Sequence, residues 1–442
     1  MTTIAALSTA PGMAGVAIIR ISGPAAGPAL ERLAGKRPRP RLATNAVLRQ
    51  ADGEPIDSAL ILWFPAPKSF TGEDVAELHV HGGRAVTTAA LRAVLAVPGI
   101  RLAEPGEFTR RAFENGKMDL AAVEGLADLI GAETEGQRRQ AYAQYASRLG
   151  QTAERLRATM VRALALVEAT IDFPDEDDVG ADALSEARRT IETLDREVLT
   201  LMADSHRGER VRDGLHVAIA GPPNAGKSTL LNTLAGRDVA IVSPIAGTTR
   251  DTLEVHLDLD GMAFVLTDTA GLRDGTDPIE AEGVRRARSR MRDSDLVLFL
   301  QAADTSEAID PDWDLGQQVK IWHVRSQIDR FAPDTSSDTF FRHHISAVQG
   351  IGIRELLADL SAFGRDVLAG EPAVLVRERH RQVFQALHEA LAESLAVDDW
   401  AKAAELVAED LRTGLNALGR ATGRVDVEAV LDVVFSSFCI GK

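Results

Sequence analysis

One short stretch of the chain has the residue types and spacing that hold phosphate groups. Residues 221–228 read Gly-Pro-Pro-Asn-Ala-Gly-Lys-Ser and match the pattern G-x-x-x-x-G-K-[ST]. Glycines let a backbone fold around phosphate oxygens, and the free N–H groups at the start of the next helix point at the anion. In this pattern Lys227 neutralises the β- and γ-phosphates and the Ser228 hydroxyl binds Mg²⁺. This phosphate loop therefore predicts a nucleoside triphosphate site.

Two segments further along the chain add groups for the same site. Asp268 can hold Mg²⁺ through water, and the amide of Gly271 can sense a γ-phosphate. Thr249 can supply a second hydroxyl to Mg²⁺. This order and spacing resemble those of the translation-factor-type GTPases. Leu272 stands where Ras-like proteins have a Gln that orients the attacking water, so hydrolysis either is very slow or uses another polar group.

Guanine selection in such proteins depends on an Asn-Lys-x-Asp segment after a later strand. Here residues 326–329 read Ser-Gln-Ile-Asp. Asp329 can still accept both hydrogen bonds from the N1 and N2 edge of guanine. Ser326 is too short to do what Asn does, and Gln327 has no charge. We expect the preference for GTP to persist with weakened affinity.

The elements that must position these segments alternate between strand and helix. Short apolar runs at 215–220, 263–267, 295–300 and 319–324 predict the strands of a doubly wound parallel sheet. The segments on either side are rich in Ala, Leu, Glu and Arg, with helical periodicity. The N-terminal part mixes short β runs with helix. The sequence thus predicts an α+β module (1–118) and a helical domain in two parts (119–211 and 369–442), with an inserted P-loop domain (212–368).

The composition excludes several other classes of protein. The chain has 442 residues, one cysteine and a formal net charge of −16, and 45% of its residues are hydrophobic. These values exclude wholesale disorder and an internal disulfide, and they argue against a nucleic-acid coat protein. No apolar run is long enough to span a bilayer. We expect a cytoplasmic protein whose nucleic-acid partner, if any, is bound by a local basic patch or by a second protein.

Long strings outside the phosphate loop carry a more specific likeness. They include Arg20-Ile21-Ser22-Gly23, Phe70-Thr71-Gly72-Glu73-Asp74 and the terminal Phe438-Cys439-Ile440-Gly441-Lys442. Through them the chain resembles the bacterial tRNA modification GTPases of the MnmE (TrmE) family from end to end. Cys439 is compatible with a catalytic role and equally with a small buried apolar residue.

The resemblance implies a folate site in the N-terminal module, which also dimerises the protein. By position, its contacts are Arg20, Glu77, Lys117 and Lys442. The implied ligand is 5,10-methylenetetrahydrofolate or a related reduced folate, which supplies a one-carbon unit.

The resemblance also implies a potassium ion beside the phosphates. Asn224 has an amide oxygen suited to a monovalent cation, and the family pattern adds Ser243, Ile245 and Thr248. Glu280 stands where the family orients the attacking water through a second water, so we expect catalysis from Glu280, Lys227 and Thr249. The predicted GTP contacts are Asn224, Ala225, Gly226, Lys227, Ser228, Thr229, Ser243, Thr248, Thr249, Asp268, Gly271, Asp329, Ser346 and Ala347.

The implied activity is one component of a larger reaction on tRNA. GTP and K⁺ bring two GTPase domains together, and hydrolysis separates them. With the FAD-binding partner MnmG (GidA), in a heterotetramer or larger complex, the family adds a carboxymethylaminomethyl or aminomethyl group at C5 of the wobble uridine. Two alternatives stay open: a GTP-dependent switch in ribosome assembly, and a family member with weakened nucleotide binding.

Overall fold

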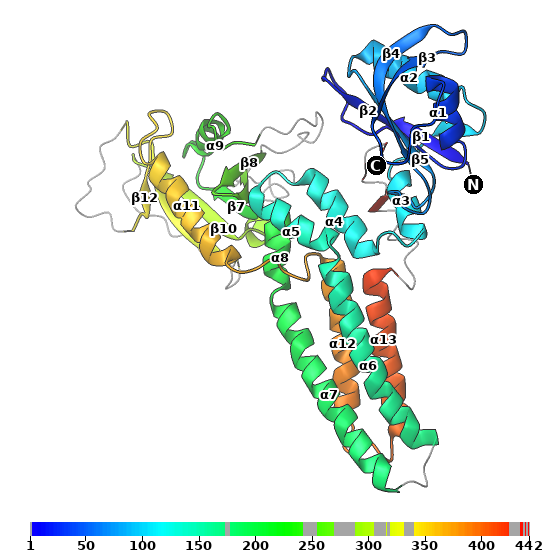
Figure 1. Ribbon diagram of the computed structural model, residues 1–442. Helices are drawn as coiled ribbons and strands as arrows, with labels where there is room; N and C mark the ends of the chain where they lie inside the picture. The colour runs from blue at the N-terminus through cyan, green and yellow to red at the C-terminus, as the bar shows by residue number, and fades with distance from the viewer. Residues whose placement is uncertain are drawn as a thin grey trace, which may run out of the picture. The chain divides into compact units, whose positions relative to one another are not determined.

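The computed structural model describes most of the chain and divides it into two compact units (Figure 1). The residues described are 2–172, 177–241, 254–268, 288–304, 315, 319–330, 340–423, 434–435, 438 and 441. The first unit contains Met1–Ala127, Gln144–Asp195 and Val383–Lys442. The second contains Asp128–Ala143 and Arg196–Gln382. Within the described part of the chain, no helix combines the length and apolar character that crossing a bilayer requires.

The N-terminal part of the first unit is built on a six-stranded sheet of order β3-β4-β5-β2-β1-β6. Its strands are β1 (Thr3–Leu7), β2 (Ala17–Ser22), β3 (Thr44–Arg49), β4 (Pro55–Phe64), β5 (Val75–Val80) and β6 (Ile100–Leu102). Helices α1 (Ala26–Ala34) and α2 (Arg84–Leu95) bury their apolar residues against the sheet, and α3 (Glu107–Glu114) follows β6. The predicted α+β character is confirmed.

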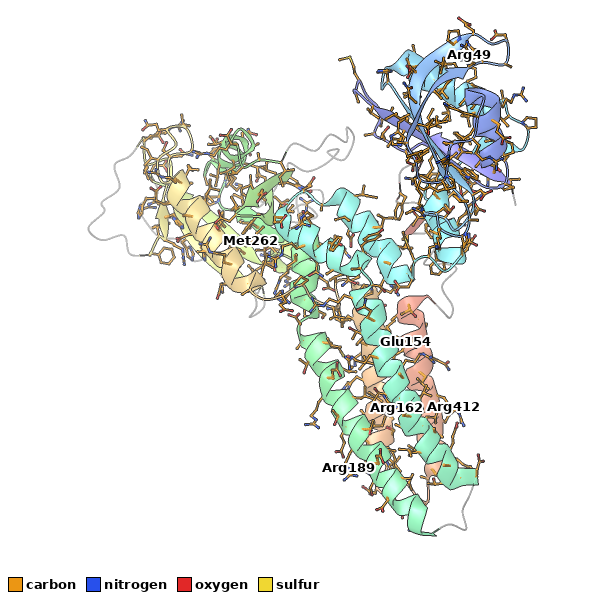
Figure 2. The ribbon with its side chains drawn as sticks, viewed as in Figure 1. Arg49, Glu154, Arg162, Arg189, Met262 and Arg412 are labelled. Atoms are coloured by element: carbon orange, nitrogen blue, oxygen red, sulfur yellow. The ribbon has the colours of Figure 1, made fainter. Side chains whose placement is uncertain are left out.

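Long helices make up the rest of the first unit and continue into the second. They are α4 (Leu120–Gly131), α5 (Glu135–Tyr145), α6 (Arg148–Asp172), α7 (Asp177–Ala203), α12 (Glu378–Ala396) and α13 (Ala404–Thr422). Gly414 lets α13 approach α6 closely, since an added Cβ would lie 2.8 Å from the Met160 side chain. At the bundle surface Arg412, labelled in Figure 2, pairs with Glu168 at 2.8 Å.

The second unit holds a sheet of order β12-β11-β10-β7-β9-β8. Its strands are β7 (Leu215–Ala220), β8 (Glu254–Leu259), β9 (Met262–Asp268), β10 (Leu296–Ala302), β11 (Lys320–Ser326) and β12 (His343–His344). Helices α8 (Ser205–Asp213), α9 (Lys227–Ala235) and α11 (Ile353–Leu368) belong to the same unit. Among the described strands of this sheet, β8–β9 is the one antiparallel pair. The doubly wound fold class is confirmed, with β8 and β12 added to the four predicted strands. The carboxyl ends of the parallel strands β7, β9 and β11 lie at one edge of the sheet, where such folds bind ligands.

Candidate nucleotide-binding site

The phosphate loop leaves the carboxyl end of β7, an interior strand. Gly221 has φ +141°, and a Cβ at this position would overlap the carbonyl oxygen of Leu300 on β10. Gly226 has φ +88° and caps the N-terminus of α9. Both positions therefore require glycine, which explains the spacing of the two glycines in the motif.

Lys227 is held inside the phosphate loop by the carbonyl oxygens of the loop. Its Nζ donates hydrogen bonds to the oxygens of Gly221 and Pro222, each at 2.9 Å. Burial lowers the pKa of Lys227 below the ordinary 10.5, while the negative charge of Asp268 opposes that effect. The ammonium group thus lies beside the loop whose backbone N–H groups would surround a phosphate.

Asp268 and Ser228 form a pair of oxygen ligands beside the phosphate loop. The Ser228 hydroxyl donates to Oδ2 of Asp268 at 2.6 Å. The carboxylate is 4% exposed, and its Oδ1 is buried without a hydrogen-bond partner among the described residues. A buried carboxylate oxygen without a donor, next to a hydroxyl, fits a hard divalent cation such as Mg²⁺.

The segment 326–329 contacts the phosphate loop directly. Ser326 is buried, and its hydroxyl donates to the carbonyl oxygen of Ala225 at 2.6 Å. Gln327 Nε2 donates to the carbonyl oxygen of Asn224, also at 2.6 Å. Although Ser326 is shorter than the Asn it replaces, it still ties the base-recognition segment to the phosphate loop.

A cavity of about 60 Å³ lies between these segments, at the place expected for a nucleobase. The predicted contacts that line it are Gly226, Thr229, Asp329 and Ala347. Ser346 is buried and its N–H donates to the oxygen of Ile351 at 3.0 Å. Of these two predicted GTP contacts, Ala347 is therefore the better placed to offer its backbone amide to a base.

Several predicted site residues lie outside the described residues, so their roles stay predictions. These are Ser243, Ile245, Thr248, Thr249, Gly271, Glu280 and Lys442, together with Leu272 and Cys439. Of the predicted potassium ligands, Asn224 is described, and it lies exposed on the phosphate loop with φ +62°.

The described folate candidates gather around one loop of the N-terminal sheet. Arg20 and Glu77 are register partners on β2 and β5, and their side chains pair at 2.9 Å. The Arg20 guanidinium also lies 5.1 Å from the centre of the Phe70 ring. Lys117 Nζ donates to the oxygen of Pro67 at 2.8 Å. The loop from Pro67 to Phe70 thus brings Lys117 near the Arg20–Glu77 pair.

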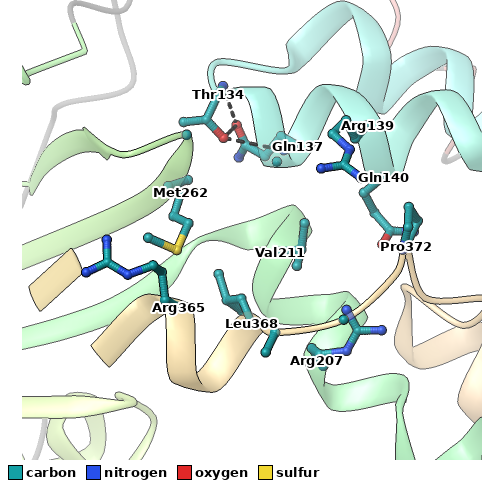
Figure 3. Close-up of a pocket in the computed structure, with 15 residues that line it drawn as sticks. Thr134, Gln137, Arg139, Gln140, Arg207, Val211, Met262, Arg365, Leu368 and Pro372 are labelled. Atoms are coloured by element: carbon teal, nitrogen blue, oxygen red, sulfur yellow. Dashed lines mark hydrogen bonds between the residues drawn. The ribbon is translucent and has the colours of Figure 1, made fainter. Parts of the chain in front are cut away.

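A second cavity, of about 260 Å³, lies in the second unit away from the phosphate loop (Figure 3). It is lined by residues of α5, α8 and α11 and by the turn between β8 and β9. At one wall the N–H of Gly136 donates to the oxygen of Gly261 at 2.8 Å. Gln137 Nε2 donates to the oxygen of Arg212 at 2.9 Å. The first contact fastens α5 to the β8–β9 hairpin and the second fastens it to α8, and no sequence pattern predicted them.

The second unit has the parts that define a P-loop GTPase: a phosphate loop after an interior parallel strand, an acidic ligand on the neighbouring strand, and a base-recognition segment with an aspartate. The family model described as "GTP-binding protein TrmE N-terminus" matches residues 3–117, and the model described as "MnmE helical domain" matches residues 120–439. The chain belongs to the MnmE (TrmE) family.

Relatives along the whole chain agree with this assignment. A protein of Rhodopseudomonas palustris (strain BisB18), named "tRNA modification GTPase MnmE", is 51% identical over 446 residues, covering 100% of this chain and 99% of that protein. A protein of the same name from Azorhizobium caulinodans is 52% identical over 442 residues, again 100% of this chain and 99% of the relative. One from Parvibaculum lavamentivorans is 51% identical over 447 residues and is covered completely. The resemblance inferred from the motifs is confirmed.

Proposed function

We propose that this chain hydrolyses GTP and that its nucleotide cycle serves the modification of wobble uridine in tRNA. The observation that carries the proposal is the joint placement of Lys227 and the Ser228–Asp268 pair at the phosphate loop. Relatives at about half identity over the full length, named tRNA modification GTPases, support the choice of pathway.

The described residues have distinct parts in nucleotide binding. Lys227 neutralises charge on the β- and γ-phosphates. Ser228 and Asp268 would hold Mg²⁺, which when bound neutralises the phosphate oxygens. Asp329 accepts hydrogen bonds from N1 and N2 of guanine, and the Ala347 N–H donates to O6. Together these groups select GTP and align its γ-phosphate for attack by water.

We assign the acceleration of hydrolysis to K⁺ and to a water held by Glu280. The amide oxygen of Asn224, with Ser243, Ile245 and Thr248, would hold K⁺ against the phosphates, where an arginine finger otherwise brings positive charge. Thr249 would supply a second hydroxyl to Mg²⁺. Glu280 would orient the attacking water through a second water and so take the part that a Gln at the position of Leu272 plays in Ras-like proteins.

The proposed folate site rests on the charged side chains that lie around the Pro67–Phe70 loop in the first unit. Glu77 offers a carboxylate that can accept the paired N–H groups of a pterin, and Lys117 offers a cation for the carboxylates of a folate tail. Arg20 and Lys442 complete the proposed set. This site would bind methylenetetrahydrofolate, whose one-carbon unit enters the group added at C5 of uridine.

The proposed assembly is a homodimer that works with the FAD-binding partner MnmG (GidA). We place dimerisation in residues 1–118, the nucleotide cycle in 212–368 and the helical domain in 119–211 and 369–442. The net charge of −16 agrees with a partner that provides much of the tRNA-binding surface.

The rate of GTP hydrolysis in K⁺ and in Na⁺ tests the proposed nucleotide chemistry. We expect turnover to be several-fold faster in K⁺, and Asn224→Ala to remove the difference. Equal rates in the two salts would contradict the assignment of the cation. The alternative hypothesis, a family member with weakened nucleotide binding, predicts instead that titration with GDP shows no guanine-specific binding.

A further inference from the structure

The side chain of Gln327 bridges two parts of the candidate nucleotide site. Its Nε2 donates to the carbonyl oxygen of Asn224 in the phosphate loop at 2.6 Å. Its Oε1 accepts a hydrogen bond from Nη1 of Arg330 at 3.3 Å. One amide group therefore connects the phosphate loop to the guanidinium of Arg330.

The backbone around Gln327 is held in an uncommon conformation by its neighbours. Gln327 has φ +57°, in the left-handed region that residues with a Cβ seldom adopt. The preceding Ser326 is fixed by its bond to Ala225, and the N–H of Arg330 donates to the oxygen of Gln327 at 3.1 Å. This tight turn places the side chains of Gln327 and Arg330 at the same cavity.

Arg330 brings a positive charge to that cavity. It lines the space together with Asp329, Ala347 and Val348. Its guanidinium pairs with no carboxylate of the described residues, whereas Arg342, which precedes β12, pairs with Asp359 at 2.9 Å. A planar guanidinium that is not committed to a carboxylate can stack on an aromatic ring.

We propose that Arg330 is a base-binding residue that stacks on the face of the nucleobase, and that Gln327 is the residue that positions it. The Asn-Lys-x-Asp pattern has a positively charged lysine at its second residue, where this chain has Gln327. In the proposed arrangement Arg330 provides that positive charge instead. The inference rests on the proposed function, because it requires a guanine nucleotide in this cavity.

The proposal separates affinity from base selection. Asp329 reads hydrogen-bond donors on the edge of the base, so it discriminates guanine from other bases. A guanidinium on the ring face is tolerant of base identity, because every base has a π-face. Arg330 should therefore raise the affinity for guanine and hypoxanthine nucleotides by the same factor.

Calorimetric titration of the full chain with GDP tests the proposal. For Arg330→Ala we expect the dissociation constant to rise about two- to five-fold, and for Gln327→Ala by at least as much, since it also loses the bond to Asn224. The dissociation constant of the Gln327→Ala/Arg330→Ala double variant should rise by less than the product of the two single fold-changes. Arg354→Ala is the matched control: Arg354 lies on α11 with its side chain 91% exposed, and it should leave the constant unchanged.

Restoring the lysine gives an independent test. In a Gln327→Lys variant the new ammonium can contact the base. Adding Arg330→Ala to that variant should therefore raise the dissociation constant for GDP by a smaller factor than it does in the original chain. The ratio of GDP to inosine diphosphate affinity should not change in Arg330→Ala, whereas Asp329→Asn should change it.

Three results separate failure of the inference from failure of the proposed function. Tight GDP binding with Arg330→Ala indistinguishable from Arg354→Ala would overturn the role of Arg330. A changed GDP to inosine diphosphate ratio in Arg330→Ala would overturn face-on stacking. If the original chain, with an intact melting transition, bound no guanine nucleotide, the proposed function would fail first and the inference with it.

Discussion

At the scale of single residues, the nucleotide site depends on charges that the fold has partly desolvated. Lys227 is bonded to the carbonyls of its own loop and Asp268 keeps one buried oxygen without a donor. The hydrogen bonds that the described residues give these two groups come from neutral partners, and each group lies beside the place where a polyphosphate and its cation would lie. The protein thus holds both charges in position before the ligand binds.

The lowered pKa of Lys227 leads to a pH prediction. A bound polyphosphate favours the ammonium form and so raises this pKa above its value in the free protein. Since the pKa is higher in the complex than in the free protein, binding takes up a proton in the window between the two values. The affinity for GDP should fall as alkaline pH rises through that window.

Calorimetry in two buffers of different ionisation enthalpy measures this proton uptake. Lys227→Arg is the control, because arginine keeps its charge throughout that pH range and should remove the uptake. Binding of GDP by the original chain without any proton uptake at alkaline pH would contradict the account.

The residues of the phosphate loop could be predicted from sequence because their chemistry is local. Gly221, Gly226 and Lys227 act within eight consecutive positions, and the structure explains each of them. The bonds from Ser326 and Gln327 to the phosphate loop could not be predicted, since they depend on how β11 lies relative to β7. The sequence showed only that the usual Asn and Lys were missing.

At the scale of elements, the closeness of β7 and β10 fixes the start of the phosphate loop. Gly221→Ala would place a Cβ against the carbonyl oxygen of Leu300, at a φ that alanine rarely adopts. We expect the free energy of unfolding to fall by about 2 kcal/mol or more. Gly236→Ala, at the end of α9 with φ −85° and its nearest neighbour at 3.7 Å, should change it by less than about 0.5 kcal/mol.

Chemical denaturation of the two glycine variants measures these changes. Equal effects of Gly221→Ala and Gly236→Ala would show that the proximity of β10 does not limit the residue at position 221.

The contact between α5 and the β8–β9 hairpin gives a second prediction at this scale. A Cβ at Gly136 would lie 2.8 Å from the oxygen of Gly261, so Gly136→Ala should push the turn away and weaken their hydrogen bond. We expect faster exchange of the backbone amide at position 136 and a loss of about 1–2 kcal/mol of unfolding free energy.

Gly131→Ala is the control for this contact, because no atom lies within 4 Å of an added Cβ and alanine favours helix. Unchanged exchange around residues 134–140 and 258–263 in Gly136→Ala would refute the idea that this contact fastens the hairpin.

Elements with a strong apolar pattern were predicted well and edge elements were not. The predicted strand 215–220 agrees with β7, and the runs at 263–267, 295–300 and 319–324 fall within one residue of β9, β10 and β11 at their starts. β8 and β12 were missed because each lies at an edge of its sheet, and β12 has only two residues. The cavity of Figure 3 joins segments more than 200 positions apart, from Thr134 to Pro372, which no local pattern reveals.

At the scale of the whole molecule, the nucleotide residues and the folate residues belong to different compact units. The phosphate loop and Asp329 lie in the second unit, and Arg20, Glu77 and Lys117 lie in the first. Under the proposed function neither unit performs the reaction alone, so loss of GTP turnover should abolish modification even when the folate site is intact. This dependence connects the phosphate-loop chemistry to tRNA.

The content of modified wobble uridine in tRNA tests this central claim most directly. It can be measured by mass spectrometry in a bacterium whose own family member is deleted and replaced by this chain. We predict that the original chain restores the C5 modification and that Lys227→Ala, produced at the same level, does not. Failure of the original chain to restore it, or equal restoration by Lys227→Ala, would contradict the account.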